Sequence, residues 1–171
     1  MKFVYILVVL LYATNIYGQV EIVSEEMLTQ KIKHSDKEYK LICIFCNYCT
    51  GVEHRYSEVV KEARNNKNME AFFICAQDGG EIAQNDSFEK MGMNVYLINQ
   101  LRKRKLISFY NPIKAAAKYL KTYLGVDSEE MGASAFCILD KENKVIVQTN
   151  WKMEDDEYFR TMKVGLQSGT K

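Results

Sequence analysis

The sequence predicts a single α/β domain in which helices flank a central mixed β-sheet. An apolar run at 41–45 leads into an amphipathic helix and then a second apolar run at 71–76. This order implies a right-handed crossover between two parallel strands. Two more apolar runs, at 135–139 and 145–149, flank a short polar turn and predict an antiparallel hairpin. Parallel and antiparallel neighbours together make the sheet mixed.

Length and composition agree with one folded domain. The chain has 171 residues, of which 47% are hydrophobic, with nine Gly and one Pro. These values suit a domain with its own core and argue against a disordered or collagen-like chain. The formal net charge of +1 provides no broad field for nucleic acid or an anionic membrane, so we expect no nucleic-acid partner. Five Cys are too few for a disulfide scaffold, and their odd number raises the question of what they do.

Residues 1–18 have the pattern of a secretory signal peptide. Lys2 precedes an apolar run at 3–13, and the small residue Gly18 ends the segment. The run is shorter than the roughly 20 apolar residues that span a bilayer, although an uncleaved anchor is the alternative. We therefore expect cleavage near Gly18, export to the periplasm or outside the cell, and a mature domain of 19–171 without stable membrane insertion. Disulfides persist in such compartments.

The N-terminal half of the mature chain predicts two buried strands joined by a helix. Residues 19–36 are expected to be an entry segment with a short helix at 25–33. The continuous apolar run 41–45 is typical of a strand buried on both faces, as is 71–76. The helix between them carries apolar side chains at helical spacing: Val52, Tyr56, Val59, Val60 and Ala63.

The middle of the chain has weaker signals. We expect a helical turn at 87–91 and strands at 95–98 and 106–110. Asn111 and Pro112 are typical of an N-cap and the first helical position, and Gly125 fits the end of that helix.

The chain ends in a predicted helix over 154–166. Acidic residues occupy its first turn, where the helix dipole favours them. The apolar side is formed by Tyr158, Phe159, Met162 and Leu166. The acidic run 154–157 and the basic run 102–105 are interpreted as solvated charges, and docking of an acidic partner on the basic run has no support.

Cys46-Asn47-Tyr48-Cys49 lies where the first strand meets its helix. Unpaired N–H groups and the dipole at a helix N-terminus favour a thiolate, and such sites lower a Cys pKa from about 8.5 to roughly 3.5–7.5. The second Cys, one turn on, can resolve a mixed disulfide. We therefore assign Cys46 as nucleophile and Cys49 as resolving thiol, with no metal or organic cofactor.

A metal site is the weaker interpretation of these cysteines. Cys43, Cys46 and Cys49 have the C-x2-C-x2-C spacing of iron–sulfur proteins, but no fourth Cys follows nearby. A zinc site would need two more ligands, and the only histidines, His34 and His54, are not in a paired-ligand spacing.

The other three cysteines fall in predicted strands. Buried free Cys behaves as a small hydrophobe, so Cys43, Cys75 and Cys137 are interpreted as core residues. Thiol exchange between Cys43 and the neighbouring pair is the alternative.

Two segments together resemble the thioredoxin superfamily, and most closely its exported TlpA-like thiol-disulfide oxidoreductases. The first is the strand that ends in Phe45, followed by Cys46-Asn47-Tyr48-Cys49 and a helix. The second, residues 132–147, is similar to the family's GVPTTFLIDKDGKIV hairpin. The resemblance covers roughly 41–166, including an insert between the second core strand and the following core helix.

The sequence departs from the family pattern at two positions beside the cysteines. Ser134 stands where the family has a cis-proline that shapes the substrate groove. Because a cis bond before a non-proline residue costs about 2.5–4 kcal/mol, we expect a trans Ala133–Ser134 bond, with the Ser134 N–H and hydroxyl available beside the sulfurs. Lys40 replaces a buried carboxylate that assists proton transfer in many thioredoxins. The dipeptide Asn47-Tyr48 is also uncommon in this motif.

The resemblance implies an exported thiol-disulfide oxidoreductase, and by resemblance alone a reductase. Its partners would be a disulfide-containing protein substrate and a thiol-disulfide electron donor. The departures at Ser134 and Lys40 favour an alternative, a thioredoxin-fold binding module with little turnover. A Cys-ligated metal protein is the third and weakest option.

Overall fold

The computed structural model describes residues 20–45, 53–75, 93–98, 112–127 and 131–167. The expected signal peptide, the helical turn at 87–91, the strand at 106–110 and the basic run 102–105 lie outside these ranges.

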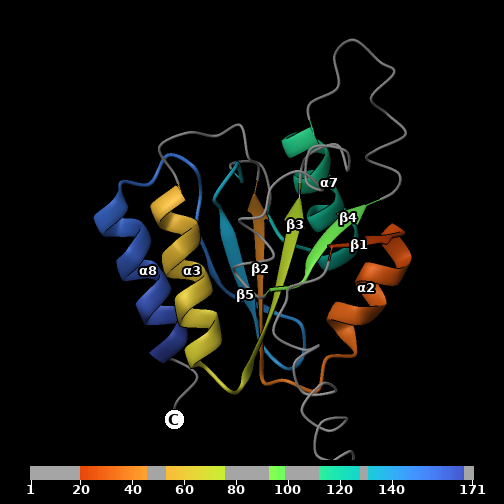
Figure 1. Ribbon diagram of the computed structural model, residues 1–171, viewed down its shortest axis with the longest axis horizontal. Helices are drawn as coiled ribbons and strands as arrows, with labels where there is room; N and C mark the ends of the chain where they lie inside the picture. Colours follow the sequence, from red (N-terminus) through yellow and green to blue (C-terminus); the bar gives the residue numbers. More distant parts are fainter. Residues whose placement is uncertain (1–19, 46–52, 76–92, 99–111, 128–130, 168–171) are drawn as a thin grey trace, which may run out of the picture.

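A mixed sheet forms the centre of the molecule (Figure 1). Within the described ranges it has six strands in the order β1-β4-β3-β2-β5-β6. Neighbours from β1 to β2 are parallel, whereas β5 is antiparallel to β2 and β6 to β5. The predicted parallel pair and hairpin are therefore confirmed. The strands are β1 (Val20–Val23), β2 (Tyr39–Phe45), β3 (Met69–Cys75), β4 (Val95–Ile98), β5 (Phe136–Leu139) and β6 (Val145–Gln148).

Helices cover both faces of the sheet. One face carries α3 (Glu53–Asn65) and α8 (Asp155–Gln167), and the other carries α2 (Glu25–Lys33) and α7 (Pro112–Leu124) (Figure 1). As predicted, Pro112 is the first residue of α7, and Gly125 follows its end with φ of +68°, a conformation that glycine adopts without strain.

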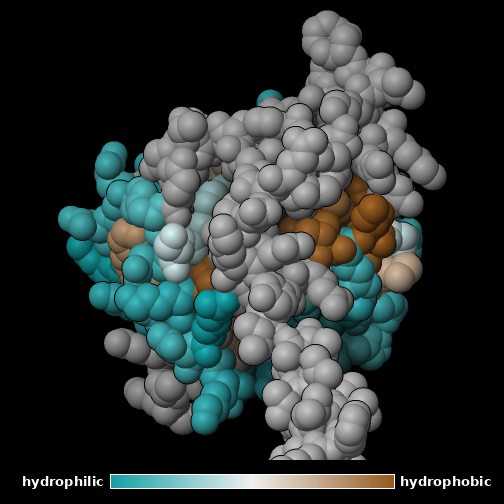
Figure 2. Space-filling view, in the orientation of Figure 1, coloured by the Kyte–Doolittle hydropathy of each residue, from teal (hydrophilic) through white to brown (hydrophobic). Residues whose placement is uncertain are grey.

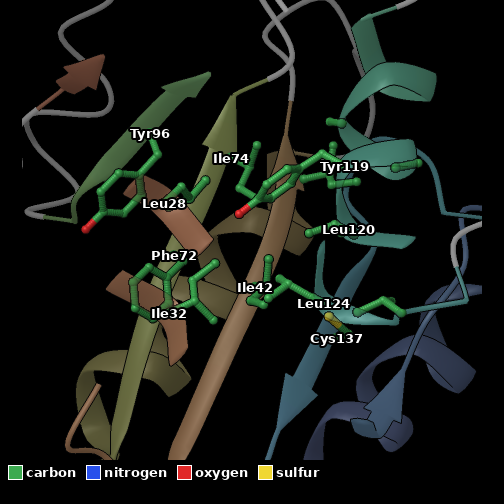
Figure 3. Close-up of a cluster of buried hydrophobic side chains, with 14 of the residues drawn as sticks. Leu28, Ile32, Ile42, Phe72, Ile74, Tyr96, Tyr119, Leu120, Leu124 and Cys137 are labelled. Atoms are coloured by element: carbon green, nitrogen blue, oxygen red, sulfur yellow. The ribbon is translucent and has the colours of Figure 1, made fainter. Parts of the chain in front are cut away.

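Alternation along β2 divides the core into two clusters. Leu41 and Cys43 pack under α3 and α8, while Ile42 and Ile44 pack under α2 and α7. Figure 3 shows the second cluster, in which Cys137 lies beside Ile42 and Leu124. Cys43, Cys75 and Cys137 are all buried, which confirms their interpretation as core residues.

Strand β1 was not predicted, because residues 19–36 were expected to be an entry segment around the helix 25–33. That helix is confirmed as α2, but Val20–Val23 pairs in parallel with β4 at the edge of the sheet. Only Val23 of this strand is buried, so the sequence lacks a strand pattern there.

In Figure 2, hydrophobic side chains gather over β1 and β4, and the surface over α3 and α8 is largely hydrophilic. In the parts of the chain that the structure describes, no helix is long and apolar enough to cross a membrane.

Gly165 in α8 provides a test of the packing of this helix on the sheet. A Cβ added at Gly165 would lie 2.6 Å from Val147 Cγ2 and 3.0 Å from Ile138 Cδ1. Intrinsic propensity favours Ala over Gly in a helix by about 1 kcal/mol. We expect the clash to prevail, so that Gly165→Ala lowers the free energy of unfolding by about 1–2 kcal/mol. Urea unfolding measures the change, with Val164→Ala as the exposed control, and an equally stable Gly165→Ala protein would contradict the packing.

Candidate functional site

The flanks of the cysteine pair are described, although the pair is not. Strand β2 ends at Phe45, the residue before Cys46, and helix α3 begins at Glu53. The strand and the helix predicted on either side of the motif are therefore confirmed. Cys46, Asn47, Tyr48 and Cys49 lie outside the described residues, and their assignment as a redox site stays a prediction.

Ser134 lies beside the end of β2. Its N–H donates to the Ile44 carbonyl oxygen at 2.9 Å, and the Ile44 N–H donates to the Ala135 carbonyl oxygen at 3.0 Å. Ile44 precedes Cys46 by two residues, so the turn that contains Ser134 is fastened to the strand that leads into the motif. The Ala133–Ser134 bond is trans, as predicted. We expected the Ser134 N–H to be available beside the sulfurs, but this expectation is wrong, because the N–H is bonded to the Ile44 carbonyl oxygen.

Ser134 adopts a backbone conformation that is rare for serine. Its φ is +70°, and the Ala135 N–H donates to the Gly132 carbonyl oxygen at 3.1 Å. A turn with positive φ at its third residue normally has Gly or Asn there, and the left-handed region costs other residues about 1–2 kcal/mol. The Ser134 side chain is buried, and its hydroxyl has no hydrogen-bond partner among the described residues. Such strain persists only where the surroundings hold it.

Tyr158 of α8 holds the carbonyl group of Ser134. The Tyr158 hydroxyl donates to the Ser134 carbonyl oxygen at 2.7 Å. The ring is fully buried and meets Phe136 and Phe159 edge-on, at centroid distances of 5.2 and 5.5 Å. Burial raises the pKa of Tyr158 far above its ordinary value, so the hydroxyl remains a protonated donor.

Arg55 connects the beginnings of α3 and α8. Its guanidinium lies 4.8 Å from the centroid of the Tyr158 ring and donates to Asp155 and to the Met153 carbonyl oxygen, each at 2.7 Å. His54 Nε2 lies 2.7 Å from the other Asp155 carboxylate oxygen. Hydrogen bonds from Arg55, and then from His54, lower the pKa of Asp155. The sequence did not single out Arg55, Asp155 or Tyr158 as partners in a site.

Lys40 stabilises the hairpin. It is fully buried in β2, and its Nζ donates to the Asp140 and Lys141 carbonyl oxygens at 2.8 and 2.9 Å. Burial lowers the pKa of this amine. Lys40 therefore holds the turn between β5 and β6 and supplies no carboxylate for proton transfer.

The surroundings of the buried thiols Cys43 and Cys137 and of His34 indicate structural roles for these side chains. Burial raises the pKa of Cys43 well above its usual range and that of Cys137 to about 12, which makes both poor nucleophiles. His34 Nδ1 lies 3.0 Å from the Gln30 carbonyl oxygen. In the described parts of the chain, no three His, Cys, Asp or Glu side chains are grouped as metal ligands.

The fold is thioredoxin-like. The chain is similar to a thiol:disulfide interchange protein from Bacteroides sp., with a TM-score of 0.51 and 12% identity over 83% of this chain and 80% of that one. It is similar to the pneumococcal exposed lipoprotein thioredoxin of Streptococcus pneumoniae, with a TM-score of 0.50 and 14% identity over 80% and 89% of the two chains. The thioredoxin domain of a Bacteroides vulgatus thiol-disulfide oxidoreductase also has a TM-score of 0.50, at 12% identity over 75% and 79%. No protein-family model and no curated protein sequence matches the chain.

Removal of the Tyr158 hydroxyl tests its role at Ser134. We expect Tyr158→Phe to lower the free energy of unfolding by about 1–3 kcal/mol, because a buried carbonyl group loses its donor. Tyr119→Phe is a matched control, since Tyr119 is also buried and its hydroxyl lies 3.0 Å from Thr29 Oγ1. Hydrogen exchange of the Ser134 amide should accelerate in Tyr158→Phe alone. Equal exchange in both variants would contradict the proposed restraint.

The lowered pKa of Asp155 predicts a pH-dependent contribution to stability. Because the folded-state pKa lies below the ordinary value of 3.8, the contribution is complete above pH 3.8 and is lost as the pH falls through the folded-state pKa. Asp155→Asn should therefore lower the melting temperature most above pH 3.8 and progressively less below it. Asp156→Asn, in the same helical turn, controls for the loss of one charge. A difference from wild type that does not change with pH would exclude this linkage.

Proposed function

We propose that this protein is an exported thiol-disulfide oxidoreductase that reduces protein disulfides through Cys46 and Cys49. The observation that supports this proposal best is the backbone next to the motif. Strand β2 leads into Cys46, and the Ser134 turn is hydrogen-bonded to that strand at Ile44. The thioredoxin-like fold of the redox proteins named above agrees with this arrangement.

The proposed reaction needs no cofactor. The Cys46 thiolate attacks one sulfur of a substrate disulfide, the substrate S–S bond breaks, and the leaving thiolate takes a proton. The Cys49 thiolate then attacks the Cys46 sulfur, which releases the second substrate thiol. The substrate gains two electrons and the protein is left with a Cys46–Cys49 disulfide, which a dithiol electron donor reduces again.

Export rests on the N-terminal segment. Residues 1–18 fit a signal peptide, and we propose 19–171 as the mature domain, periplasmic or secreted. A comparison protein, the pneumococcal lipoprotein thioredoxin, is described as exposed. In such a compartment disulfide-containing proteins are available as substrates.

A binding module without turnover is the second candidate. The observation that favours it is Lys40, whose amine is hydrogen-bonded to the hairpin turn. Many thioredoxins have a proton-transferring carboxylate at the position of Lys40. A thioredoxin-like fold does not by itself establish chemistry.

Insulin-disulfide reduction by the mature protein separates the two candidates. With dithiothreitol as electron donor, we expect the wild type to accelerate precipitation of the insulin B chain. Cys46→Ser should abolish the acceleration, because it removes the attacking thiolate, and Cys49→Ser should leave a trapped mixed disulfide. Cys137→Ala is the matched control, since this thiol is buried in the core. Equal inertness of the wild type and both Ser variants would reject the enzyme and favour the binding module.

A further inference from the structure

Trp151 is an exposed aromatic residue near the candidate redox site. It is the only Trp in the chain, and 58% of its surface is exposed, the largest fraction among the large hydrophobic side chains that the structure describes. It lies in the connection between β6 and α8, beyond the end of β6.

The neighbour of Trp151 places it beside Ser134. A Cβ added at Gly132 would lie 2.8 Å from Trp151 Cβ and 2.9 Å from Cγ, so the base of the indole rests on Gly132. Gly132 closes the turn that contains Ser134, and Ser134 is hydrogen-bonded to Ile44. Trp151 therefore stands at the end of the sheet where the chain continues into Cys46.

The backbone on both sides of Trp151 is fixed. On one side, the Thr149 N–H donates to the Phe136 carbonyl oxygen, and the Phe136 N–H donates to Thr149 Oγ1, both at 2.9 Å. On the other side, the Lys152 N–H donates to Asn150 Oδ1 at 2.9 Å. One residue further, Arg55 donates to the Met153 carbonyl oxygen at 2.7 Å. An exposed ring on such a backbone loses little freedom when a partner binds it.

We propose that Trp151 is the residue that recognises the protein substrate, by packing against the polypeptide segment next to the substrate disulfide. This inference rests on the proposed function. Trp is the residue type most enriched among those that dominate protein–protein binding energy. Without Lys2 of the expected signal peptide, the mature domain has 22 basic and 22 acidic side chains, so no broad field attracts a partner and contact area must supply affinity. The occupant we infer is an extended segment of a disulfide-containing protein that packs on the indole while its sulfur reaches Cys46.

Comparison of two substrates separates recognition from chemistry. In Trp151→Ala we expect the KM for insulin to rise about 5- to 30-fold, the effect of truncating a dominant interface residue. The rate of reaction with bis(2-hydroxyethyl) disulfide, which has no polypeptide segment, should stay unchanged. Trp151→Phe should restore most of the insulin affinity. Met27→Ala, which truncates a side chain 52% exposed on α2 at the opposite face, should behave as wild type.

The possible results distinguish a failure of the role proposed for Trp151 from a failure of the proposed function. Unchanged kinetics of Trp151→Ala with insulin, or equal losses with both disulfides, would overturn the recognition role while leaving the oxidoreductase intact. A wild-type protein inert toward both disulfides would reject the proposed function itself.

Fluorescence supplies a test that needs no substitution of Trp151. Because this is the only Trp, emission from the Cys49→Ser protein reports its environment alone. Trapping of the insulin B chain as a mixed disulfide on Cys46 should bury the indole and shift its emission to the blue. Reaction of Cys46 with bis(2-hydroxyethyl) disulfide, which leaves a 2-hydroxyethylthio group on Cys46 and releases 2-hydroxyethanethiol, is the control without a polypeptide. Equal spectra for the two adducts would overturn the inference.

Discussion

The structure around the candidate site depends on the two backbone hydrogen bonds of Ser134. Through its N–H this residue is bound to β2 at Ile44, and through its carbonyl group it is bound to Tyr158 of α8. Tyr158 in turn lies under Arg55, near the beginning of α3. The strand before Cys46, the helix after Cys49 and the terminal helix are thus joined through one buried residue. Loss of either bond would release a backbone that is held at φ of +70°.

Asp155 makes the buried position of Arg55 energetically acceptable. The Arg55 side chain is only 10% exposed, and an unpaired charge there would be costly. Asp155 is 49% exposed, so it keeps much of its hydration while it accepts from Arg55 and faces His54. Its place in the first turn of α8 also lets it interact favourably with the helix dipole. One carboxylate therefore stabilises a helix end and links two helices beside the site.

Strands and helices can be predicted from the sequence where burial produces a run or a periodic pattern of apolar residues. Contacts of the site that join residues far apart in the sequence cannot be predicted in this way. The runs 41–45 and 71–76 are apolar because both faces of those strands are covered, but β1 has one buried residue and no such signal. Tyr158 was correctly placed on the apolar side of its helix. Its bond to Ser134 joins residues 24 positions apart, and no local pattern contains that information. A buried tyrosine hydroxyl does require a partner, which is the only sequence-level signal available.

Compared with the cis-proline of thioredoxins, serine at position 134 changes the conformation of the whole turn and not only one side chain. Proline has no N–H, so it could not form the bond to Ile44, and its ring fixes φ near −65°. The observed φ of +70° is closed to proline, so a proline at this position would require a different turn. The turn from Gly132 to Ala135 instead uses the N–H of residue 134 to bind Ile44. The Tyr158 hydroxyl donates to the carbonyl oxygen of the same residue. The difference from the thioredoxin motif at this position is therefore compensated within the fold. Because the turn is hydrogen-bonded to β2 at Ile44, two residues before Cys46, it restrains the strand that leads into the predicted redox motif.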